Sequence, residues 1–116
     1  MQATEHHLQR NVSQETIDRY GRINGDNDII HYDQDYALKR GFRGTLAHGL
    51  MVMGYACELA AQAHGERWFR GGSIHVKWVD PVCPGDVVAV DLDGEGNVRA
   101  AVGEELVLVG TARGRA

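Results

Sequence analysis

The segment from Gly49 to Ala63 restricts the fold of this chain more than any other feature. Its side chains are apolar around almost the whole circumference of a helix, and only Glu58 and Gln62 interrupt them, on one stripe. A helix of this kind is buried in a protein core. It is far too short to cross a bilayer of about 30 Å at about 1.5 Å per residue. The rest of the chain must therefore wrap around it.

Strand patterns recur on both sides of this segment, with alternating apolar and polar residues in the longer runs. We predict strands over residues 6–12, 74–79, 87–92, 98–102 and 106–112. The strands after the long helix are joined by turn-rich segments of hairpin length, so they should be antiparallel.

Two short helices are predicted before the long one. Ser13 is a suitable N-cap for a helix whose apolar residues recur from Ile17 onward, and Gly25 ends it. Asp33 is a suitable N-cap for a second helix over residues 34–40.

A buried helix followed by a curled antiparallel sheet predicts an α+β hot-dog fold, in which the sheet wraps around the helix. The length of 116 residues corresponds to a single hot-dog domain over residues 1–116. So short a chain leaves the sheet edge and one side of the helix uncovered. We therefore expect a homodimer that pairs these surfaces.

Composition excludes several kinds of protein. The net charge of -4 argues against nucleic acid as a partner, because binding phosphates requires a basic face. Cys57 and Cys83 lie far apart without metal-binding spacing, which indicates free thiols in a reducing compartment. The sequence has neither a signal-peptide pattern nor a membrane-spanning run. We expect no membrane partner and a cytoplasmic location.

The residues that can carry chemistry lie near the ends of two predicted helices. Asp26 and His31, five positions apart, offer a general base and a general acid. Gly49 offers a backbone N–H at the positive end of the long helix, where developing negative charge can be held. These three groups are the ones needed to add water across a double bond next to a carbonyl, or to remove it.

Three segments of the chain follow a known pattern. Residues 24–33, Asn-Gly-Asp-Asn-Asp-Ile-Ile-His-Tyr-Asp, are similar to the signature G-D-x-N-P-x-H-x-D. Residues 41–50 contain His48-Gly49 ahead of the long helix, and residues 76–86 end in a Pro-Val-x-x-Gly-Asp turn. In this order the segments resemble the MaoC-like (R)-specific enoyl-CoA hydratases and dehydratases, a hot-dog family.

The resemblance implies reversible syn addition of water to a trans-2-enoyl thioester, carried by coenzyme A or an acyl carrier protein. It implies no metal and no redox cofactor. Asp26, favoured as base, and His31, favoured as acid, would hold the water between them, and Gly49 N–H would bind the thioester oxygen. Four further residues are candidates for substrate binding: His48, Asp28, Met53 and Cys57. His48 would mainly shape the turn before the helix.

Two residues depart from the signature, since Asp28 replaces its Asn and Ile29 its Pro. If the carboxylates of Asp28 and Asp26 converge, the pKa of one of them rises. Loss of the proline frees the backbone φ in this loop.

Other functions remain open at this point. A hot-dog thioesterase would direct the water at the thioester carbonyl, and a catalytically silent module would only bind acyl groups or dimerise. A dehydratase of secondary metabolism would use the same residues on a substrate whose chain is not a fatty acyl chain. Retention of both Asp26 and His31 favours hydration, because thioester hydrolysis needs no proton donor to carbon. A metal on Asp26, Asp28 and His31 is disfavoured, since they match no recognised ligand pattern.

Overall fold

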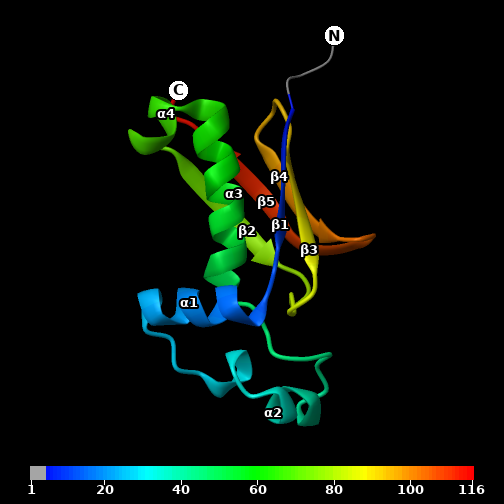
Figure 1. Ribbon diagram of the computed structural model, residues 1–116. Coiled ribbons are helices and arrows are strands. Elements are labelled where there is room, and N and C mark those ends of the chain that lie inside the picture. The colour runs from blue at the N-terminus through cyan, green and yellow to red at the C-terminus, as the bar shows by residue number, and fades with distance from the viewer. Residues whose placement is uncertain (1–4) are drawn as a thin grey trace.

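A computed structural model describes residues 5–116, and its centre is one helix packed against one curved sheet (Figure 1). The strands are β1 (His6–Asn11), β2 (Ser73–Trp78), β3 (Val87–Leu92), β4 (Asn97–Val102) and β5 (Glu105–Arg113). They are ordered β1-β3-β4-β5-β2, and each neighbouring pair is antiparallel. The predicted α+β hot-dog fold is confirmed.

The central helix, α3 (Gly49–His64), ends one residue later than predicted. Its buried side chains pack with the inward-facing residues of β3, β4 and β5, such as Val90 and Leu108. Burial is not uniform around the helix, since the side chain of Leu50 is 51% exposed. The helix therefore has one face without cover within the protomer, as its apolar circumference and the short chain predicted.

The helices α1 (Gln14–Asn24) and α2 (Gln34–Lys39) lie at the N-terminal end of α3 (Figure 1). Ser13 caps α1 by accepting a hydrogen bond from Thr16 N at 3.1 Å, and Asp33 caps α2 through Tyr36 N at 3.0 Å. Both caps were predicted. Two short elements were not: the 3₁₀ turn η1 (Ile29–His31) and α4 (Glu66–Phe69).

The two edges of the sheet are β1 and β2. The edge strand β2 ends beside the start of α3, where Trp78 is 46% exposed. An uncovered edge of this kind has free backbone groups that can pair with another chain. Within residues 5–116, the helices are all too short or too polar to cross a membrane.

Candidate active site

The loop between α1 and η1 positions Asp26. Gly25 ends α1 in the left-handed conformation (φ 77°), and Asn24 Oδ1 then accepts a hydrogen bond from Asp26 N at 2.9 Å. Asp26 Oδ1 accepts from Asp28 N at 3.0 Å, and Asp28 Oδ1 accepts from Ile30 N at 3.0 Å. These consecutive side chain-to-backbone turns fold the chain back, so that His31 returns to Asp26.

Asp26 and His31 form a close acid–base pair. Asp26 Oδ2 lies 3.3 Å from His31 Nε2, and their side chains are 38% and 11% exposed. His31 Nδ1 lies 2.8 Å from the carbonyl oxygen of Leu46. A carbonyl can only accept, so Nδ1 carries a proton and Nε2 is the nitrogen that can exchange one next to Asp26.

The environment of Asp26 favours its carboxylate form. The hydrogen bond from the Asp28 N–H is the largest cause that lowers the pKa of Asp26, and the nearby His31 and His48 lower it further. Partial burial opposes them. From the sequence we expected the pKa of Asp26 or Asp28 to rise if their carboxylates converged. The pKa of Asp26 is instead lowered. Asp28 stabilises the Asp26 carboxylate through its backbone N–H, while its own carboxylate caps η1.

His48 lies behind this pair, at the N-cap of α3. It is only 2% exposed, and its ring stacks on His31 with centroids 3.9 Å apart and planes inclined by 22°. Burial, followed by the neighbouring His31, lowers the pKa of His48 below its ordinary value of 6.5, so the ring is neutral at pH 7. His48 Nε2 lies 3.2 Å from the Tyr32 hydroxyl.

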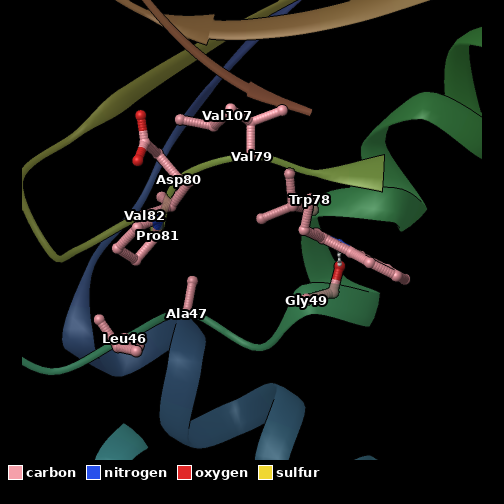
Figure 2. Close-up of a pocket in the computed structure, with 10 residues that line it drawn as sticks. Leu46, Ala47, Gly49, Trp78, Val79, Asp80, Pro81, Val82 and Val107 are labelled. Atoms are coloured by element: carbon pink, nitrogen blue, oxygen red, sulfur yellow. Dashed lines mark hydrogen bonds between the residues drawn. The ribbon is translucent and has the colours of Figure 1, made fainter. Parts of the chain in front are cut away.

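Gly49 begins α3, so its N–H has no acceptor within the helix. Its carbonyl accepts a hydrogen bond of 2.8 Å from Trp78 Nε1, and Figure 2 shows the indole lying across the start of the helix. A Cβ on Gly49 would lie 3.1 Å from Trp78 Nε1. The absence of a side chain is what lets Trp78 approach this closely.

A largely apolar pocket of about 270 Å³ opens beside Gly49 (Figure 2). Its wall is formed by Leu46, Ala47, Gly49, Val52, Trp78, Val79, Asp80, Pro81, Val82 and Val107. Asp26 instead lines a shallow polar recess together with Arg22, Asn27 and Tyr32. The predicted oxyanion donor and the predicted base thus face different hollows of the protomer.

The other predicted substrate-binding residues lie apart from these hollows. Met53 and Cys57 are partly buried on α3, and neither belongs to the wall of the pocket beside Gly49. Burial raises the pKa of the Cys57 thiol, which disfavours a nucleophilic thiolate there. Their role in binding stays a prediction.

Among residues 5–116, one cluster offers metal-binding atoms. Ligand atoms of Asp26, His31 and His48 lie within 4.8 Å of one another. However, the two imidazole rings are stacked nearly parallel, so an ion in the plane of one ring would lie outside the plane of the other. At least one ring would therefore have to reorient before both could bind the same ion.

Several residues of the site were missed in the sequence. Gln14 Nε2 donates to the carbonyl of His31 at 2.9 Å, and Gln14 Oε1 accepts from Thr45 Oγ1 at 2.5 Å. Tyr32 and Trp78 also contact the site, as described above. The contacts of Gln14 and Trp78, and that of Tyr32 with His48, carry no local signal, because each joins segments that only the folded chain brings together.

Comparison with known proteins shows the family to which this chain belongs. The family model described as "MaoC like domain" matches residues 1–112. The peroxisomal multifunctional enzyme type 2 of Drosophila melanogaster is 32% identical over 87 residues, and that of Mus musculus 31% identical over 77. These matches cover 72% and 66% of this chain but only 14% and 10% of the relatives.

Solved structures share the fold over almost the whole chain. The full-length Drosophila enzyme superposes with a TM-score of 0.77 and 26% identity, covering 92% of this chain and 22% of that one. The (R)-hydratase from A. caviae involved in PHA biosynthesis gives a TM-score of 0.80 at 18% identity, covering 97% and 93%. Since the family model matches nearly the whole sequence, the chain belongs to the MaoC-like domain family.

Proposed function

We propose that this protein catalyses the reversible hydration of trans-2-enoyl thioesters to (R)-3-hydroxyacyl thioesters, carried by coenzyme A or an acyl carrier protein. The observation that carries the proposal is the 3.3 Å approach of Asp26 Oδ2 to His31 Nε2. His48 stacks on His31 and is followed by Gly49, so the pair lies beside the first turn of α3. The proposed acid is therefore close to the proposed oxyanion donor, although Asp26 and Gly49 line different hollows of the protomer.

In the proposed reaction, Asp26 and His31 hold one water molecule between them. The Asp26 carboxylate takes a proton from the water as its oxygen attacks Cβ, and His31 Nε2–H gives a proton to Cα. His31 acts here as an imidazolium whose Nδ1–H stays on the Leu46 carbonyl. The lowered pKa of Asp26 keeps the base ionised before the reaction.

The N–H of Gly49 is the proposed donor to the thioester oxygen, which becomes enolate-like during the reaction. One preorganised donor of this type is typically worth roughly 3–4 kcal/mol of barrier. The apolar pocket beside Gly49 supports this assignment, since it offers a place for part of an acyl group.

We also propose that the working unit is a homodimer. The pocket of about 270 Å³ is slightly smaller than typical ligand sites, which span about 300–1,000 Å³. It lies next to the exposed Leu50 and Trp78 and the free edge of β2, so a second copy placed there would enlarge and enclose it. Related folds are found in assemblies, such as the ChsH1-ChsH2 complex from Mycobacterium tuberculosis. The cytoplasmic location stays a prediction.

The decisive experiment follows the enoyl-thioester absorbance with crotonyl-CoA and a longer trans-2-enoyl-CoA, while free thiol is measured in parallel. We expect the wild type to lose absorbance without releasing thiol, and Asp26→Asn and His31→Ala to be inactive. Asp35→Asn is the matched control, because Asp35 is exposed on α2 and does not line the recess that contains Asp26.

Other outcomes would identify the alternatives. Release of thiol would indicate a thioesterase. Binding of an acyl thioester without turnover, unchanged in Asp26→Asn, would indicate a catalytically silent acyl-binding module.

A further inference from the structure

The Tyr32 hydroxyl joins two parts of the site at once. Its oxygen lies 2.5 Å from the carbonyl oxygen of Asp26 and 3.2 Å from His48 Nε2. A carbonyl can only accept, so the single hydroxyl proton is donated to Asp26. The Tyr32 oxygen must then accept from His48, and His48 must carry its proton on Nε2.

The surroundings of His48 agree with this tautomer. With the proton of a neutral ring on Nε2, Nδ1 has only a lone pair. His48 Nδ1 is buried and has no hydrogen-bond partner among residues 5–116. Burial also lowers the pKa of His48, which keeps a second proton off the ring.

Gly21 provides the space for this hydroxyl. It is buried in α1, and a Cβ built there would lie 1.9 Å from Tyr32 Oη and 3.0 Å from Tyr32 Cζ. Glycine is unfavourable in a helix interior compared with alanine. The close approach of Tyr32 explains why glycine stands at position 21.

We propose that Tyr32 is a positioning residue that holds the backbone of Asp26 and the tautomer of His48 together, and that Gly21 is required to admit it. This inference rests on the proposed hydratase function for its effect on catalysis. The geometry on which it rests does not depend on that function.

The hydrogen bonds of Asp26 show why the Tyr32 hydroxyl matters for the site. Its N–H is held by Asn24, its Oδ1 by Asp28 N–H, and its carbonyl by Tyr32. Oδ2 is the atom left facing His31. Without the Tyr32 hydroxyl, the peptide after Asp26 loses its anchor, and His48 can move its proton to Nδ1. Both groups that flank the His31 ring would then lose a defined position.

The test is Tyr32→Phe, with the ring nitrogens of His31 and His48 observed by ¹⁵N NMR. We expect wild-type His48 to be neutral and protonated on Nε2, and the variant to show a mixture of tautomers. We also expect kcat for crotonyl-CoA hydration to fall about tenfold to a hundredfold, with KM little changed, because a small displacement of a reacting group is costly. Tyr36→Phe is the control, since its hydroxyl contacts Arg40 on α2.

Gly21→Ala tests the second part of the inference. The added Cβ should expel the Tyr32 hydroxyl and reproduce the change in the His48 tautomer. Tyr32→Phe removes Tyr32 Oη, the atom closest to the added Cβ. Gly21→Ala in the Tyr32→Phe background should therefore cause little further loss of kcat or of thermal stability. Unfolding curves for all variants separate misfolding from mispositioning.

The inference is overturned if His48 in folded Tyr32→Phe keeps the wild-type Nε2–H signal, or if the two substitutions act additively. A wild-type protein that is inactive on enoyl thioesters of both coenzyme A and an acyl carrier protein would refute the proposed function instead. The NMR comparison would still decide whether Tyr32 sets the tautomer of His48.

Discussion

The imidazole rings of His31 and His48 stack 3.9 Å apart, yet their surroundings differ. His31 Nε2 faces the Asp26 carboxylate, while His48 is enclosed and its pKa is lowered by burial. A neutral ring behind His31 avoids a second positive charge when His31 is protonated. In the proposed reaction, His31 exchanges the proton while His48 stays neutral.

Burial of His48 makes folding stability depend on pH. Because the pKa of folded His48 lies below its ordinary value of 6.5, the unfolded chain takes up a proton first as the pH falls. The contribution of His48 to folding stability is present above about pH 6.5 and is lost as the pH falls toward the pKa of His48 in the folded protein. We expect urea unfolding to show a larger loss of stability between pH 7.5 and 5.5 in wild type than in His48→Gln.

His7 contributes to the same pH window with the opposite sign. Its hydrogen bond to Asp91 raises the pKa of His7, so its contribution is present at low pH and lost as the pH rises. Wild type and His48→Gln both contain His7. The difference between their pH dependences of stability therefore reports on His48. Equal slopes for wild type and His48→Gln would contradict the assignment.

Substitutions of Asp28 should distinguish the role of its side-chain oxygen in capping η1 from the role of its negative charge. Asp28→Asn keeps the oxygen that caps η1, so stability and kcat should stay close to wild type. Asp28→Ala loses that cap and should cost about 0.5–2 kcal/mol of unfolding free energy. Urea unfolding and steady-state kinetics measure both. A raised KM in Asp28→Asn would be the signature of the substrate contact predicted from the sequence, and a fall in kcat would contradict the structural role.

Gly49→Ala should disturb Trp78. The new Cβ would lie 3.1 and 3.2 Å from two indole atoms, and overpacking of this kind typically costs about 1–3 kcal/mol. We expect lower thermal stability and lower kcat/KM, with part of the stability recovered in Gly49→Ala/Trp78→Phe. Gly54→Ala on the same helix is the control, because its Cβ would meet nothing within 4 Å. Equal effects of the two alanines would show that Trp78 is irrelevant.

Leu50→Glu should disrupt the proposed homodimer. A charge placed on the uncovered face of α3 would have to be desolvated in the interface. Leu38 on α2 is 50% exposed, almost the same as Leu50, so Leu38→Glu is the matched control. We expect sedimentation equilibrium to give dimers for wild type and Leu38→Glu, and monomers for Leu50→Glu. A monomeric wild type would rule out the homodimer.

Much of the fold was predictable because its signals are local. The apolar circumference from Gly49 onward required a core helix, and the alternation in the later strands required a half-buried sheet. Ser13 and Asp33 were identified as caps because capping needs only a side chain a few residues from its target. The short η1 and α4 were missed, since one turn of helix has little periodicity.

The sequence by itself determined the helix-and-sheet architecture and pointed to Asp26 and His31 as the candidate acid–base pair. Helical and strand periodicity, helix caps and a contiguous motif are each local signals. Only the tertiary structure decided what surrounds that pair. Tyr32 reaches His48 across 16 positions and Trp78 reaches Gly49 across 29. That Asp28 bonds Asp26 through its N–H and caps η1 with its carboxylate depended on how the loop turned. Such contacts depend on the relative placement of whole elements, which no local pattern specifies.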